Sequence, residues 1–165
     1  MRTLFVALRA VLYGAGFVLF WGWVASGARR YDARLSIAPS SSWKPVGTLL
    51  MVPGALLVLA CVGSFVFRGQ GTPAPFDPPV RFVPTGPYRY VRNPMYIGAA
   101  LFLAGYGLWD GSVSIALLSL VLLAAAHVFV LLVEEPGLER RFGGSYLAYK
   151  RTVRRWLPRL SPGPS

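Results

Sequence analysis

The stretch GPYRYVRNPMYIG, residues 86–98, carries two arginines, two prolines, three tyrosines and an asparagine within thirteen residues of a mostly hydrophobic chain. An unpaired polar group in hydrocarbon is costly, so such a cluster is expected at a water boundary or in a cavity. A second polar cluster, EEPGLERRFGGSYLAYKRTVRR, covers residues 134–155. We therefore expect the two clusters to build one site for a soluble cofactor at the membrane surface.

The composition indicates a membrane protein. The 165 residues are 55% hydrophobic, and the mean hydropathy is +0.51. Apolar runs of about 20 residues are typical of transmembrane helices. We predict an all-α, integral-membrane helical bundle with about four transmembrane helices and a cytosolic C-terminal cofactor pocket. The predicted spans are 4–26, 46–67, 95–109 and 112–133, with a turn at 109–112 where Asp110 or Ser112 can cap the next helix.

The chain is organised as a single domain, 1–165, in three portions. Residues 1–67 form a two-helix transmembrane portion. Residues 68–94 form a proline-rich cytosolic loop that ends in the first polar cluster, because five prolines and two glycines in 68–85 disfavour helix and strand. Residues 95–165 form a helical hairpin and a C-terminal cofactor-binding segment.

The net charge of +11 predicts the topology. The cations lie beside apolar runs, which favours membrane topology and contact with lipid headgroups over nucleic-acid binding. Twelve Arg and Lys residues lie at the N-terminus, in 68–94 or after 134, and four lie in 27–45. We expect an integral protein of the bacterial inner membrane with both termini cytoplasmic. The single cysteine, Cys61, offers neither an intrachain disulfide nor a metal ligand set, so no metal is expected.

The two clusters fit the patterns G-P-Y-x-x-x-R-[HN]-P-x-Y-x-G and E-E-x-x-L-x-x-x-F-G-x-x-Y-x-x-Y, with V-x-R-x-x-P after them. The matching residues are Gly86, Pro87, Tyr88, Arg92, Asn93, Pro94, Tyr96 and Gly98, then Glu134, Glu135, Leu138, Phe142, Gly143, Tyr146, Tyr149, Val153, Arg155 and Pro158. This order resembles the isoprenylcysteine carboxyl methyltransferase and phospholipid methyltransferase group of integral-membrane enzymes.

The resemblance implies S-adenosylmethionine as methyl donor and a lipophilic acceptor that arrives laterally between helices. The acceptor would be a small molecule or lipid-anchored substrate: a prenylcysteine-like carboxylate, a lipid amine or a thiol. The residues expected to bind the donor are Gly86, Pro87, Tyr88, Arg92, Asn93, Pro94, Tyr96, Glu134, Glu135, Tyr146 and Tyr149. The residues expected to act in catalysis are Arg151, Arg154, Arg155 and Glu135.

Two positions depart from the family pattern. Asn93 stands where the family usually has histidine, and an asparagine can hydrogen-bond but cannot carry a proton. Thr152 stands where a tail arginine is expected to hold a carboxylate acceptor, which leaves Arg151, Arg154 and Arg155 to replace it. The one histidine, His127, is seven residues before Glu134 and roughly on its helix face, so it is a candidate for acceptor binding; the alternative is a buried structural histidine.

Other interpretations stay open. The acids at 134 and 135 can belong to an exposed helix end paired with Arg140 and Arg141. A membrane reductase with a related C-terminal fold, as in the sterol reductases, would use a nicotinamide cofactor. A non-catalytic membrane protein would keep the fold and lose the activity.

Overall fold

A computed structural model of the chain describes residues 2–35, 41–74, 77 and 79–159, and over these residues it contains helices and loops but no strand. The helix α1 covers Arg2–Ala28, followed by a short turn and α2, Asp32–Leu35. The helix α3 covers Lys44–Ser64 and continues as a π-helical turn through Phe65–Gly69. The described residues between 70 and 93 are irregular, as predicted for this proline-rich stretch, except for one short 3-10 helix at Gly86–Arg89.

The C-terminal half is a helical hairpin followed by two short helices. The helix α4 covers Pro94–Asp110 and α5 covers Val113–Phe129. A π-helical turn at Val130–Glu134 joins α5 to α6, Glu135–Phe142, and α7 covers Gly144–Thr152. The predicted turn at 109–112 is confirmed. Gly111 takes a left-handed conformation, φ 73°, and the Ser112 hydroxyl accepts a hydrogen bond from the backbone N–H of Ile115.

The prediction of about four spans holds approximately. In the described part of the chain, three helices are long and apolar enough to cross a membrane, namely Thr3–Leu35, Lys44–Gly69 and Val113–Phe142. The helix α4 has 17 residues, which is at the short end of the length that a span needs. It packs between α3 and α5 and is as apolar as they are.

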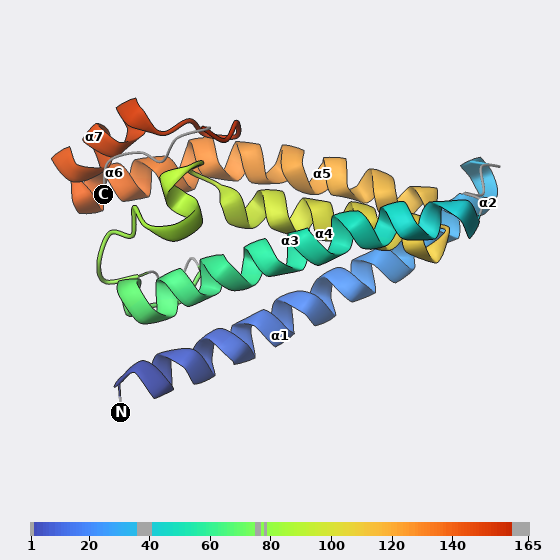
Figure 1. Cartoon of the computed structure of the whole chain (residues 1–165), viewed down its shortest axis with the longest axis horizontal. Coiled ribbons are helices and arrows are strands. Elements are labelled where there is room, and N and C mark those ends of the chain that lie inside the picture. Colours follow the sequence, from blue (N-terminus) through green and yellow to red (C-terminus); the bar gives the residue numbers. More distant parts are fainter. Residues whose placement is uncertain (1, 36–40, 75–76, 78, 160–165) are drawn as a thin grey trace.

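Figure 1 shows the chain returning to the same end of the bundle. The N-terminus, the loop after α3, and α6 and α7 lie together at one end, and α2 lies at the other. This is the arrangement that an even number of crossings predicts, and it brings both polar clusters to one membrane surface.

Glycines allow α3 and α4 to approach closely. A Cβ added at Gly54 of α3 would lie 2.7 Å from the carbonyl oxygen of Gly98 in α4, and a Cβ at Gly98 would lie 2.9 Å from the carbonyl oxygen of Gly54. Both distances are too short for carbon and oxygen atoms. Small residues at crossing points are typical of membrane helix pairs, because backbone contact replaces side-chain packing there.

Replacing Gly54 by alanine is therefore expected to separate α3 from α4 and to lower the free energy of unfolding by about 1–3 kcal/mol. The matched control is Gly14→Ala in α1, because nothing lies within 4 Å of the Cβ at that position. Unfolding of the detergent-solubilised protein in denaturant measures both variants. Equal stability of the two would show that the α3–α4 contact is looser than described.

Candidate functional site

The two polar clusters are joined by hydrogen bonds between the first cluster and the C-terminal tail. The backbone N–H of Arg92 donates to the carbonyl oxygen of Arg154 at 2.9 Å. The side-chain amide of Asn93 donates to the carbonyl oxygen of Arg155 at 3.1 Å. The predicted meeting of residues 86–98 with residues 134–155 is thus confirmed, and the tail folds over the start of α4.

A cavity of about 410 Å³ lies where the clusters meet, a volume typical of small-molecule sites. Eight of the eleven predicted donor-binding residues line it: Tyr88, Arg92, Asn93, Tyr96, Glu134, Glu135, Tyr146 and Tyr149. The other three are Gly86, Pro87 and Pro94, which do not line it. Gly86 begins the 3-10 helix with a φ of +61°, Pro87 follows it, and Pro94 is the first residue of α4. These three shape the backbone that presents the lining side chains.

Glu135 is the centre of a cluster of cations. Its carboxylate accepts two hydrogen bonds from Arg155, Nε to Oε1 at 2.7 Å and NH2 to Oε2 at 3.1 Å. It also lies 3.2 Å from NH1 of Arg92 and 3.3 Å from Nζ of Lys150. The residue is 5% exposed. The interpretation of an exposed helix end paired with Arg140 and Arg141 is therefore wrong for Glu135, whose partners come from the loop before α4, from α7 and from the tail.

Arg92 is buried without a full set of hydrogen bonds. Its side chain is 9% exposed, yet neither Nε nor NH1 makes a hydrogen bond of good geometry to another described residue. The contact of NH1 with Glu135 is an ion pair only. Buried polar groups are normally satisfied, and Arg92 is also a lining residue of the cavity, so its guanidinium is a candidate for contact with an anionic group of a ligand.

Glu134 differs from its neighbour. The hydroxyl of Tyr96 donates to its Oε2 atom at 3.1 Å, and the salt bridges found among the described residues do not include Glu134. Consecutive residues of a helix point about 100° apart, so the two adjacent acids meet different surroundings. One carboxylate is thus held by cations, and the other faces the cavity with a neutral partner.

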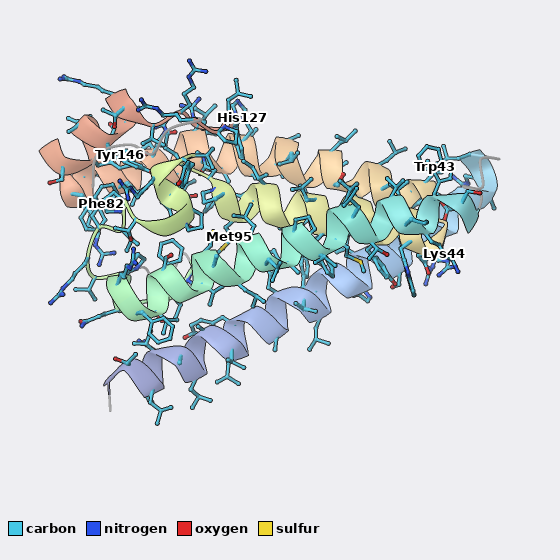
Figure 2. The ribbon with its side chains drawn as sticks, in the orientation of Figure 1. Trp43, Lys44, Phe82, Met95, His127 and Tyr146 are labelled. Carbon is cyan, nitrogen blue, oxygen red and sulfur yellow. The ribbon has the colours of Figure 1, made fainter. Side chains whose placement is uncertain are left out.

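The predicted tyrosine pair of α7 is buried. Tyr146 and Tyr149 pack on Phe82 from the loop, with ring centroids 5.8 Å and 5.2 Å from it, and Figure 2 shows Phe82 and Tyr146 together at this end of the bundle. The hydroxyl of Tyr149 donates to the carbonyl oxygen of Tyr88 at 2.7 Å. Burial raises the pKa of the Tyr149 phenol, so it stays a neutral donor at physiological pH.

The predicted catalytic arginines are not equivalent. Arg155 is bound to Glu135, whereas Arg151 and Arg154 are exposed, and the tail arginines do not line the cavity. Thr152 donates its hydroxyl to the carbonyl oxygen of Tyr149 at 3.0 Å and so belongs to the end of α7. A role for Arg151 or Arg154 in holding an acceptor remains a prediction.

His127 lies outside the cavity. It is exposed on α5, and its Nδ1 atom accepts a hydrogen bond from Nε1 of Trp156 at 2.9 Å. The alternative of a buried histidine is wrong, because α5 presents this residue on its outer surface. A role for His127 in acceptor binding remains a prediction. Trp156 also packs edge-on against Tyr96 with ring centroids 6.4 Å apart.

Sequence patterns missed the apolar part of the cavity wall. Thr72, Pro73, Ala74, Pro79, Phe82 and Val83 come from the loop, and Phe65, Met95, Phe129, Val130 and Val133 come from α3, α4 and α5 and their extensions. The unusual length of the loop was the available signal, since long loops are often functional. Nothing in the local sequence marks the helix residues, which look like any others in a span.

Comparison with known proteins now agrees with this geometry. Residues 43–145, more than half of the chain, match the family model described as phospholipid methyltransferase, PEMT. The chain belongs to this family of membrane methyltransferases. A protein of Haemophilus influenzae described as uncharacterized is 39% identical to it over 64 residues, which is 38% of this chain and 100% of that protein. No solved structure matches the chain.

Proposed function

We propose that this protein transfers a methyl group from S-adenosylmethionine to a lipophilic acceptor at the membrane surface. Membership of a methyltransferase family and a cavity of suitable volume support the proposal. The single observation that carries it is the Arg92 guanidinium, a buried cation of a lining residue whose Nε and NH1 atoms lack a hydrogen-bond partner among the described residues.

The cavity residues fit the donor group by group. Arg92 is suited to the carboxylate of the methionine end, because a guanidinium binds carboxylates by charge-assisted hydrogen bonds. Glu134 and the Tyr96 hydroxyl beside it are suited to the ammonium or the ribose hydroxyls. The aromatic rings of Phe82, Tyr88 and their neighbours are suited to the adenine. When bound, S-adenosylmethionine supplies an electrophilic methyl on a sulfonium.

The apolar part of the cavity wall is suited to a lipophilic acceptor. Met95, Phe129 and Val133 line the cavity, and Leu132, next to Val133, is 71% exposed and does not line it. In a bilayer this exposed surface would contact lipid, so an apolar acceptor could reach the cavity sideways. The three acceptor classes remain a carboxylate, an amine and a thiol.

The residues can assist transfer in two ways. Holding donor and acceptor in line supplies much of the acceleration in such a displacement. An amine or thiol must also lose a proton, and Glu134 is the cavity carboxylate that no cation among the described residues neutralises. Glu134 is therefore a better candidate for a general base than Glu135. We also expect the cavity end, which has the excess of basic residues, to face the cytoplasm.

Calorimetric titration of the purified protein with S-adenosylhomocysteine tests the proposal. We expect binding in the range of roughly 1 µM to 1 mM that is typical of enzyme ligands, and no binding of NADPH in the same detergent. Binding of NADPH alone would support a reductase. No binding of either would support a non-catalytic protein. Lipid extracts incubated with a methyl-labelled donor would then identify the acceptor.

A further inference from the structure

Among the described residues, an ion pair joins helix α1 to the loop that forms one wall of the cavity. NH1 of Arg9 lies 3.0 Å from Oδ1 of Asp77, and the two side chains are 32% and 21% exposed. Arg9 belongs to a membrane-length helix outside the region that matches the family, residues 43–145. An arginine within a span is costly and usually has a functional partner.

Asp77 is bonded directly to residues of the cavity wall. The backbone N–H and the hydroxyl of Thr72 both donate to the carbonyl oxygen of Asp77 at 3.1 Å. The backbone N–H of Asp77 donates to the carbonyl oxygen of Ala74 at 3.0 Å. Thr72 is fully buried, and both Thr72 and Ala74 line the cavity. A shift of Asp77 would therefore move this part of the wall.

The arginine is held in place by rigid packing around it. Val6 and Ala10, on either side of Arg9 in α1, are buried against Val66 in the π-helical turn that ends α3. This contact fixes the start of α1 on the end of α3. The Arg9 guanidinium is thus presented from a packed helix, whereas Asp77 lies in a loop.

The loop is also closed at its base by backbone hydrogen bonds. The carbonyl oxygen of Gly69 accepts hydrogen bonds from the backbone N–H groups of Val80 at 2.9 Å and Arg81 at 3.2 Å. Asp77 lies beyond this closure, and Arg9 is the cation that forms a salt bridge with it among the described residues. Without Arg9, a partly buried carboxylate would lose its counter-charge and turn toward water.

We propose that Arg9 is a positioning residue for the cofactor cavity, which keeps the wall at Thr72 and Ala74 in its binding geometry by holding Asp77. The proposal rests on the proposed function, since it assigns to α1 a part in binding S-adenosylmethionine. It makes α1 more than a membrane anchor.

The test combines ligand binding with local hydrogen exchange in Arg9→Ala, Arg9→Lys, Asp77→Ala and the double variant. We expect Arg9→Ala to weaken S-adenosylhomocysteine binding about tenfold, within the usual coupling range for contacting residues, and to speed exchange at the Thr72 and Asp77 amides. Arg9→Lys keeps the positive charge, so its ligand affinity and its amide exchange should both be close to those of the unchanged protein. The double variant should be no worse than Arg9→Ala. Arg68→Ala removes an exposed cation at the same end of the bundle and should change neither readout.

The two readouts separate this inference from the proposed function. If the unchanged protein does not bind S-adenosylhomocysteine, the proposed function is wrong, and Arg9 has no part in binding that donor. Faster exchange in Arg9→Ala would then show only that the ion pair holds the loop. Faster exchange with unchanged affinity would confine the ion pair to loop structure and overturn the inference. Unchanged exchange in Arg9→Ala, or additive losses in the double variant, would also overturn it. Thermal unfolding checks that every variant is folded.

Discussion

Glu135→Ala is expected to lower the free energy of unfolding by about 3–5 kcal/mol, the usual cost of removing one partner from a buried ion pair. The carboxylate is 5% exposed and neutralises Arg92, Lys150 and Arg155. Its loss would leave Arg92 and Arg155 together without a carboxylate partner, although Lys150 would keep Glu139, and the tail that Arg155 anchors would detach from the cavity. Thermal unfolding in detergent measures the loss, and cofactor affinity should fall with it.

The matched control is Glu139→Ala, one turn further along α6. Glu139 has a half-exposed side chain, 37%, and its one salt bridge among the described residues is with Lys150, so its removal should cost well under about 1 kcal/mol. Lys150 would keep its contact with Glu135. If the two variants were equally stable, the cluster around Glu135 would not hold the tail as described.

Arg92→Ala is expected to weaken S-adenosylhomocysteine binding by about a hundredfold or more, because a buried charged hydrogen-bonding partner of the ligand is lost. The fold should survive, since Arg155 and Lys150 still neutralise Glu135. Arg92→Lys keeps the charge but not the planar fork of donors, so an intermediate loss is expected. Calorimetry on the folded variants measures all three affinities.

Arg81→Ala serves as the control for Arg92, because Arg81 is an exposed arginine of the same loop that does not line the cavity. It should bind the ligand as the unchanged protein does. Unaltered affinity in Arg92→Ala would remove Arg92 from the site. A loss in both variants would point to general attraction by the basic surface.

Much of the site could be predicted because its residues lie in two short motifs. Tyr88, Arg92, Asn93 and Tyr96 are grouped within nine residues. Polar groups between apolar spans are expected at the membrane surface or in a cavity. Their common cavity follows once both motifs lie at one end of the bundle. His127 does not line the cavity with Glu134, because a seven-residue spacing places two residues on one face only of an unbroken α-helix, and the π-helical turn at Val130–Glu134 changes the register before Glu134.

The roles of the charged residues could not be predicted from the motifs. Glu134 and Glu135 are adjacent and chemically identical, yet one meets Tyr96 and the other meets three cations. The partners come from distant parts of the chain, so the local sequence does not indicate which glutamate meets the cations. The same holds for Arg9, whose partner Asp77 is 68 residues away.

The sequence by itself determined the helical membrane fold, the turn at Gly111 and Ser112, and the end of the bundle at which the polar residues gather. These features depend on the length and hydropathy of single segments and on local capping, which neighbouring residues decide. Only the tertiary structure decided which carboxylate is neutralised, which arginine is buried beside the cavity, and which loop residues close the cavity. Those outcomes depend on charges and hydrogen bonds brought together across the chain, where the cost of an unpaired buried group selects the partners.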